Sequence, residues 1–390
     1  MRPARSLTVA LVTFATLIDI IAYSIGVPVL PDLSRRLGAS ATTIGFLFAS
    51  FGVTVLAVSV PMGAISDRVG RRGPLVGGLV ALSASTLLFA VAERLPALFA
   101  ARLVQGAADG VTWVVGFALI ADLYGPDERG RVMGIVMSGT TFGFLIGPTL
   151  GGWLYEQGGA QLPFLVLAVL AALGAVAFAA IPLPARTDRI ETVPLGAVLK
   201  VPSVGACAAA VVLAGSTIAM LEPIVALHLA ERIGLGPSRI GLVFGVGAFA
   251  SILLHPYFGG IADRSGGRRL TMAGLLAMGC VVPILGLMSS FASAVMLYFV
   301  IVVPIAMVVT PSLTYMAEAT SMAGVGSFGV AYGLYNFAWA VGLLFGPSIG
   351  GVMYERLGFQ VLLLAWAPGV VATTGLIAVA SRRGKTTPAL

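Results

Sequence analysis

Charged residues are scarce in this chain. Only 10% of its 390 residues are Asp, Glu, Lys or Arg, whereas soluble domains carry about 25%. This low share excludes an ordinary soluble domain, and the 58% of hydrophobic residues indicates an integral membrane protein. The 50 glycines and 22 prolines agree with that class, because membrane helices use both residues more freely than soluble helices do.

Cysteine and histidine are also rare, with two of each. Cys207 and Cys280 lie in separate apolar runs, so no disulfide framework is predicted. No pair of metal ligands has a suitable spacing, and no phosphate-binding loop or catalytic triad is visible. We therefore expect no metal, no cofactor and no enzyme activity, which disfavours a membrane enzyme or sensor. The roles of His228 and His255 stay open.

The net charge of +7 comes from short basic clusters between apolar runs. That distribution is typical of the positive-inside rule and of contact with anionic lipid headgroups. It does not predict a nucleic-acid-binding face.

Twelve apolar runs are long enough to cross a bilayer, for which a helix needs about 20 residues. Sixteen lysines and arginines lie at the two ends of the chain and in or next to the even-to-odd loops, against six on the opposite side. Both termini are therefore predicted to be cytoplasmic. The predicted spans are 7–30, 41–64, 74–93, 97–121, 131–155, 162–182, 203–229, 237–261, 270–289, 292–317, 326–352 and 358–381.

Two motifs occur twice. "GAISDRVGRR" (Gly63–Arg72) returns as "GGIADRSGGRR" (Gly259–Arg269), each after the second span of its half. "GPTLGGWLYE" (Gly147–Glu156) returns as "GPSIGGVMYE" (Gly346–Glu355), each in the fifth span. Repeats at near-equal offsets indicate two similar halves.

The predicted fold is an all-α membrane protein with two pseudo-symmetric bundles of six helices. We expect the first bundle at 1–182 and the second at 201–390, joined by a polar cytoplasmic linker at 183–200.

These motifs make the chain resemble the major facilitator superfamily over nearly its whole length. "RxxQG" (Arg102, Gln105, Gly106), the repeated "GxxxDRxGRR" and the glycine-proline run of the fifth span are similar to the signature of its drug/proton antiporter branch. "AMLEP" (Ala219–Pro223) and "PFLVLA" (Pro163–Ala168) resemble the vesicular monoamine and acetylcholine transporters and their bacterial relatives. The resemblance implies the twelve-helix fold of that superfamily and transport by alternating access.

The turn after the second span predicts a conformational latch. Glycine permits close approach of helices, and an acid there can face the positive N-terminus of a neighbouring helix. A topology signal is the alternative, but arginines alone would satisfy it. The predicted latch residues are Gly63, Asp67, Arg68, Gly70 and Arg71.

The glycine-proline runs predict close and bendable helix packing. Gly143 and Gly147 are four residues apart, so they share a helix face on which another backbone can pack. Pro148 removes a backbone hydrogen bond and permits a bend. Gly346 and Pro347 repeat the arrangement. Rocking of two bundles needs such surfaces, although plain helix packing is the alternative.

Four ionisable residues lie away from the span ends: Asp19, Arg102, Asp109 and Glu222. A carboxylate that faces lipid costs roughly 2.5–3.5 kcal/mol on insertion scales, so these groups are expected to face the bundle interior and to serve transport. The alternative is that Asp19 or Asp109 only pairs with Arg102 to hold helices together.

Desolvation disfavours the charged form of a carboxylate, so such a group can hold a proton or an organic cation by turns. Asp19 and Glu222 match the acids that the vesicular transporters keep in helices 1 and 7, which implies amine recognition and proton coupling for both. The resemblance ties Arg102 to proton transfer, through tuning of a neighbouring acid.

The chain departs from the vesicular pattern at four positions. Phe51 stands where those transporters have a lysine, and Ala306 and Asn336 stand where they have aspartates. Asp109 stands where they have a small polar residue. Asp109 is therefore a candidate to replace a lost acid in proton coupling.

Aromatic residues would complete a cation site, because a desolvated cation over a ring gains about 2 kcal/mol. Tyr23 follows Asp19 by four residues and Trp113 follows Asp109 by four, so each pair shares a helix face. Core packing is the alternative for each ring. The predicted substrate-binding residues are Asp19, Tyr23, Trp113, Glu222, Tyr335 and Asn336.

Together these patterns predict a proton-coupled antiporter that exports lipophilic organic cations, drug-like or monoamine-like. A proton-independent facilitator or a proton symporter for a neutral small solute is the alternative. Short loops and the lack of an organelle signal favour a bacterial inner membrane, and two halves in one chain favour a monomer.

Overall fold

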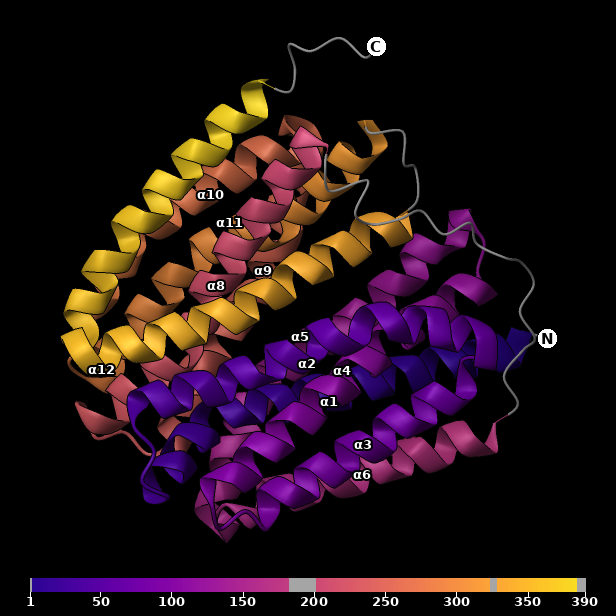
Figure 1. Ribbon diagram of the computed structural model, residues 1–390, viewed down its shortest axis with the longest axis horizontal. Coiled ribbons are helices and arrows are strands. Elements are labelled where there is room, and N and C mark those ends of the chain that lie inside the picture. The colour runs from indigo at the N-terminus through magenta and orange to yellow at the C-terminus, as the bar shows by residue number, and fades with distance from the viewer. Residues whose placement is uncertain (1, 182–200, 323–327, 384–390) are drawn as a thin grey trace. The chain divides into compact units, whose positions relative to one another are not determined.

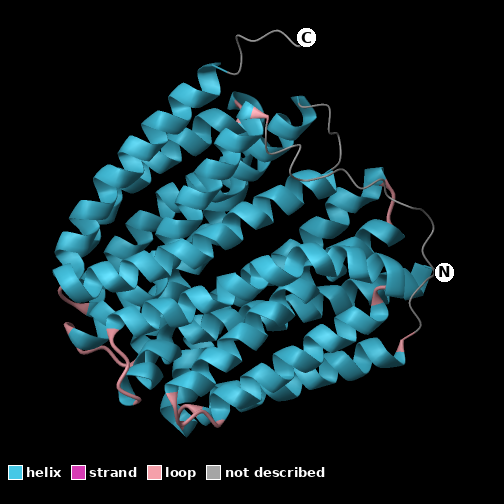
Figure 2. Cartoon of the chain, viewed as in Figure 1, coloured by secondary structure: helices cyan, strands magenta, loops and turns pink. Residues whose placement is uncertain are grey.

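The computed structural model describes residues 2–181, 201–322 and 328–383. Within these ranges the regular structure is entirely helical (Figure 2). A bilayer offers no water to pair with backbone groups, and a helix satisfies those groups within its own segment. The expected all-helical membrane fold is confirmed.

Eleven of the described helices are long and apolar enough to cross a membrane by length and composition. The first half contains α1 (Arg2–Arg36), α2 (Ala41–Val69), α3 (Arg72–Ala90), α4 (Leu95–Leu123), α5 (Pro126–Gly158) and α6 (Gln161–Ala180). The second contains α8 (Pro202–Glu231), α9 (Pro237–Ser265), α10 (Gly267–Val281) with η1 (Val282–Leu287), α11 (Phe291–Met322) and α12 (Phe328–Arg383).

The predicted eleventh and twelfth spans are the two helical arms of α12, which meet at a kink. Gly358, with φ of 77°, breaks its helical geometry at the point where the twelfth span was predicted to begin. Helix α1 is longer than predicted and continues past Pro31 to Arg36. Its last turn carries an ion pair between Arg36 Nε and Asp32 Oδ2 at 2.9 Å, and such polar groups suit the headgroup region more than the hydrocarbon core.

The chain divides into two compact units. The first comprises residues 1–190 with 234–245, and the second comprises 191–233 with 246–390. The predicted linker, 183–200, lies outside the described residues. Its boundaries stay a prediction.

In the first unit, α1 packs against α5, α2 against α4, and α3 against α4 and α6 (Figure 1). Gly143 of α5 faces α1 closely, since a Cβ there would lie 3.0 Å from Ile20 Cγ2 and 3.2 Å from the Leu17 carbonyl oxygen. A Cβ on Gly147 would overlap the Ser24 hydroxyl. The predicted glycine face of α5 is therefore the surface on which α1 packs.

The second unit repeats this arrangement, because α8 packs against α12 as α1 packs against α5. A Cβ on Gly346 would overlap the Ser216 carbonyl of α8, and one on Gly342 would lie 2.7 Å from the Gly215 carbonyl carbon. The two glycine-proline runs thus occupy equivalent positions in the two units.

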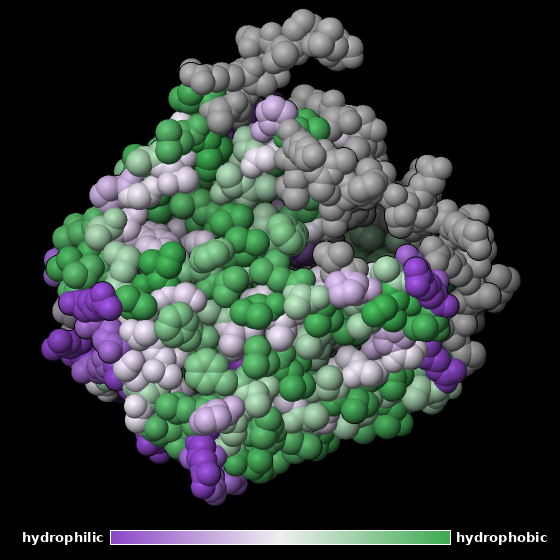
Figure 3. All heavy atoms as spheres, viewed as in Figure 1, coloured by the Kyte–Doolittle hydropathy of each residue, from purple (hydrophilic) through white to green (hydrophobic). Residues whose placement is uncertain are grey.

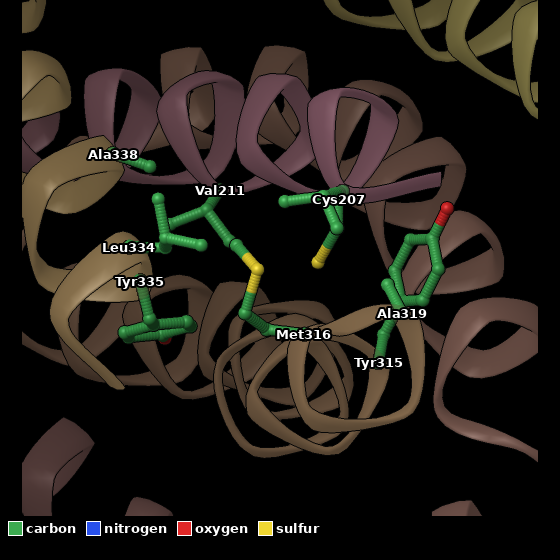
Figure 4. Packing of buried hydrophobic residues seen from close by; sticks show 9 residues of the cluster. Cys207, Val211, Tyr315, Met316, Ala319, Leu334, Tyr335 and Ala338 are labelled. Atoms are coloured by element: carbon green, nitrogen blue, oxygen red, sulfur yellow. The ribbon is translucent and has the colours of Figure 1, made fainter. Parts of the chain in front are cut away.

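A buried apolar cluster joins α8, α11 and α12 in the second unit (Figure 4). The Cys207 thiol lies within it, 3.5 Å from the Ser312 carbonyl oxygen, and Tyr315 and Met316 pack nearby. Cys207 therefore packs within this apolar cluster. On the face seen in Figure 3, hydrophobic side chains predominate and strongly hydrophilic ones gather near its margins, as a lipid-facing surface requires.

Replacement of Gly346 by alanine is expected to destabilise the protein by about 1–3 kcal/mol, because α8 and α12 must separate to admit a methyl group. Thermal unfolding of the detergent-solubilised protein measures this loss. Gly333→Ala is the matched control on α12, since a Cβ there meets nothing within 4 Å. Equal melting temperatures for the two variants would contradict the packing described for Gly346.

Candidate functional site

The carboxyl of Asp19 lies inside the first unit, and its residue is only 1% exposed. Trp113 Nε1 of α4 donates a hydrogen bond to Asp19 Oδ2 at 3.0 Å. Burial among helices of its own unit makes this charge tolerable within an apolar span. Asp19 therefore lies in the interior of the first unit, as expected.

Asp109 of α4 is the second carboxyl of this site, within hydrogen-bonding reach of Asp19. Residues four apart share a helix face, so Asp109 and Trp113 both reach α1 from one face of α4. Asp109 and Trp113 are each partly exposed, whereas Asp19 is buried. The indole of Trp113 also stacks on Phe117, with ring centroids 5.6 Å apart.

Arg102 is fully buried and sits in an aromatic cage. Its guanidinium carbon lies 5.0 Å from the ring centroid of Tyr23 and 4.9 Å from those of Phe48 and Phe51. Its Nη1 donates a hydrogen bond to Gln105 Oε1 at 2.7 Å, so the two polar residues of the "RxxQG" motif bind each other. Each cation–π contact stabilises a desolvated cation by up to about 2 kcal/mol.

The cage explains two features of the sequence. Phe51, which departs from the vesicular pattern, provides one wall against the guanidinium. Tyr23, predicted to bind substrate, is 7% exposed, and its ring packs on Phe51 and Arg102. Its part in substrate binding stays a prediction.

Arg102 also acts on Asp109 through its charge. Asp19 accepts a hydrogen bond from Trp113 of α4. The alternative prediction, in which Asp19 only pairs with Arg102 to hold helices together, did not include this contact.

In the second unit, Glu222 of α8 is partly buried, and Pro223 follows it inside the helix. The charge of Glu222 acts on Tyr298 of α11. The Tyr298 ring lies against Gly247 of α9, where a Cβ would come 2.5 Å from Tyr298 Cε1. Tyr298 was not predicted, because a single tyrosine within an apolar run gives no signal in the sequence.

The two predicted residues of α12 differ in their surroundings. The Tyr335 hydroxyl donates to the Val309 carbonyl oxygen at 3.2 Å, its ring stacks on Trp339 at 6.2 Å, and the residue is 9% exposed. Tyr335 therefore belongs to the apolar cluster of this unit. Asn336 is partly exposed. Their role in substrate binding stays a prediction.

The predicted latch contains an ion-pair network between the ends of α2 and α4. Arg71 is 9% exposed. Its Nε lies 2.8 Å from Asp122 Oδ2 and its Nη2 lies 2.6 Å from Asp67 Oδ1. Its Nη1 donates to Ser66 Oγ at 2.5 Å. Sequence reasoning found Asp67 and Arg71 but missed Asp122, which is distant in the chain.

The other predicted latch residues lie near the end of α2 or directly after it. Gly70 has φ of 86°, a left-handed conformation that favours glycine. Gly63 faces Val114 at ordinary contact distance and Arg68 is exposed. In the second unit the repeated turn has Gly266 at φ 89°, and the next amide, Gly267, donates to Glu318 Oε1 at 3.3 Å.

A tyrosine and an acid also meet at the opposite ends of the repeated helices. The Tyr155 hydroxyl of α5 donates to Asp32 of α1. In the second unit the Tyr354 hydroxyl of α12 donates to Glu231 Oε2 of α8 at 3.2 Å. These bonds tie α5 to α1 and α12 to α8, and neither was predicted.

Two further observations concern possible ligand sites in the described part of the chain. Among the described residues, no three His, Cys, Asp or Glu side chains gather as metal ligands would. A groove of about 560 Å³ in the first unit lies along α1 and α5 and contains none of the predicted binding residues. Its lining residues are Ser6, Val9, Ala10, Thr13, Phe14, Leu17, Tyr124, Val132 and Ile135.

Comparison with known proteins places these features in context. Residues 12–328 and 207–389 match the Major Facilitator Superfamily. The human chromaffin granule amine transporter is 28% identical over 326 residues, which cover 83% of this chain and 62% of that protein. The probable vesicular acetylcholine transporter-B of Danio rerio is 31% identical over 379 residues, covering 92% of this chain and 76% of that protein.

The chain spans less than two thirds of the length of the human chromaffin granule amine transporter, and 65% of the human synaptic vesicular amine transporter. A solved structure of a bacterial homolog to the human lysosomal transporter Spinster, in an inward-facing and occupied conformation, has a TM-score of 0.84. It covers 100% of both chains at 16% identity, so this likeness concerns the fold alone.

Replacement of Arg71 by lysine is expected to destabilise the protein by about 1–3 kcal/mol, because one ammonium cannot reproduce the forked contacts of a guanidinium with two carboxylates. Thermal unfolding in detergent measures the change. Arg68→Lys, at an exposed position of the same turn, serves as the control and should leave the melting temperature unchanged. A loss of similar size in both variants would rule out the network as its cause.

Proposed function

Because the chain belongs to the Major Facilitator Superfamily, we propose that it is a proton-coupled antiporter that exports lipophilic organic cations by alternating access. The observation that carries the proposal is Asp19, a carboxylate 1% exposed in the middle of an apolar helix. Intramembrane acids of this kind mark ion and substrate pathways.

Proton and cation compete for such a group. A buried carboxylate needs a positive partner or a proton, because an isolated charge in a medium of low dielectric is strongly disfavoured. Binding of an organic cation to Asp19 therefore releases a proton, and proton binding releases the cation. That exclusion is the basis of exchange.

Glu222 provides the corresponding acid of the second half and is partly buried beside Tyr298. Arg102 tunes the first site through its charge on Asp109. The aromatic rings proposed to contact the cation are those of Trp113, Tyr23 and Tyr335.

Alternating access is proposed to depend on the latch and on the glycine-proline runs. The network of Arg71 with Asp67 holds the turn after α2, and Gly63, Arg68 and Gly70 shape it. The close packing of α5 on α1 and of α12 on α8 keeps each pair together as a bundle moves.

The printed names of the relatives support an amine or another small organic cation as the substrate, since they are amine and acetylcholine transporters. We further propose a monomer in a bacterial inner membrane, surrounded by lipid, with both termini cytoplasmic. The excess of basic residues on one side supports this orientation.

Proteoliposomes with an acidic lumen test the proposal. Radiolabelled tyramine supplied outside should accumulate, and a protonophore should abolish its accumulation; protein-free liposomes correct for passive entry of the neutral amine. Tyramine uptake that the pH gradient does not change would support a proton-independent facilitator. Uptake of protons together with a neutral solute, without any organic cation, would support a symporter.

Asp19→Asn is expected to lower this exchange by roughly 100-fold or more, because the amide keeps the shape and removes the charge that binds cation and proton. Glu222→Gln should also lower it severely. The control is Glu93→Gln, an exposed acid between α3 and α4, which should exchange as the wild type does. Normal exchange by both Asp19→Asn and Glu222→Gln would refute the site.

A further inference from the structure

The hydrogen bonding of Asp19 is incomplete. Its Oδ2 accepts the indole N–H of Trp113 at 3.0 Å. Its Oδ1 is buried and receives no hydrogen bond from any donor in the described part of the chain. A buried polar atom without a partner is unfavourable by about 1–3 kcal/mol, and more when it is charged. A proton on a neighbouring carboxyl or the N–H group of a ligand is therefore needed to satisfy this oxygen.

The neighbour within reach is itself a carboxyl, that of Asp109. Two ionised carboxylates can only accept hydrogen bonds, so their contact requires either a proton on one of them or a cation that donates to both. The charged group of α4 that acts on Asp109 is Arg102. The α2 rings of Phe48 and Phe51, which lie against Arg102, are uncharged.

Arg102 already lies against three aromatic rings of this unit, so a cation at Asp19 has Trp113 as its main aromatic contact. Its guanidinium lies within 5.0 Å of the ring centroids of Tyr23, Phe48 and Phe51. Such aromatic cages are how proteins bind quaternary ammonium ions, which have no N–H to donate. In this chain the cage already surrounds a cation of the protein itself. A ligand at Asp19 is therefore recognised mainly by its hydrogen bonds to carboxyl oxygens.

We infer that Asp19 and Asp109 form a proton-sharing carboxyl pair that selects ammonium ions carrying N–H groups over quaternary ammonium ions. The inference rests on the proposed function and narrows its substrate class. Asp109 is the residue that creates the pair, at a position where the vesicular pattern has a small polar residue.

The exchange balances in charge and in protons. The empty pair holds one proton between two carboxyls and has a net charge of −1. An entering R–NH₃⁺ donates N–H groups to the two carboxylates, and the shared proton leaves to water. Release of the amine returns a proton to the pair. One proton therefore moves for each amine at this site, and a quaternary ion cannot replace the lost hydrogen bond.

Two matched compounds test the inference on the purified full-length protein: 2-phenylethylamine and its N,N,N-trimethyl analogue. Equilibrium binding is measured by calorimetry, and proton release by a pH-sensitive dye in weak buffer at a pH where the amine is fully protonated. The wild type should bind the primary amine roughly 10-fold or more tightly than the quaternary ion, because charge-assisted hydrogen bonds form only with the former. It should release close to one proton for each amine bound.

Asp109→Asn should reduce the preference to about threefold or less, because its amide cannot share a proton with Asp19 or offer a second carboxylate to the N–H groups of the amine. Asp109→Glu should recover the preference, which a merely structural role for Asp109 would not explain. Glu93→Gln is the control and should behave as the wild type does.

Equal affinity of the wild type for the two compounds, or an unchanged preference in Asp109→Asn, would overturn the inference. Exchange of both compounds against a pH gradient would then leave the proposed antiporter standing. If neither compound binds and neither is exchanged, the proposed function fails together with the inference.

Discussion

A charge inside an apolar helix bundle must find a partner within the protein, and this constraint organises the first unit. Asp19 of α1 receives the indole N–H of Trp113, and α4 also places Asp109 beside it. Because α1 must lie against α4 to meet these groups, its opposite side is left to pack on α5. The glycines of α5 allow that packing.

Arg102 shows a second way to keep a charge in an apolar bundle. Its guanidinium uses three ring faces and one glutamine oxygen. Ring faces attract a cation without carrying a formal charge, so they stabilise the buried guanidinium without adding a further acid to the site.

The two units share their packing and differ in their chemistry. The glycine-proline runs, the turns at Gly70 and Gly266, and the tyrosine–acid bonds of Tyr155 and Tyr354 recur at equivalent places. The ionisable groups in the middle of the spans differ between the units. The first unit holds two acids and an arginine, whereas the second holds Glu222 near Tyr298. Repeated packing serves the fold, so either half can diverge in its polar groups without loss of its framework.

Sequence alone determined the helical class, the positions of the spans, the two halves and the intramembrane residues Asp19, Arg102 and Asp109. A bilayer imposes length and apolarity on each span, so these properties can be read locally. The predicted first span was shorter than α1, because helices extend into the headgroup region, whereas Gly358 separates the two arms of α12 where two spans were predicted.

Only the tertiary structure decided which groups meet. Trp113 binds Asp19 across 94 positions of sequence, and Asp122 binds Arg71 across 51. Such contacts depend on how each helix is rotated about its axis and how closely glycine lets its neighbour approach. Those quantities come from packing over the whole unit, and no local pattern of residues records them.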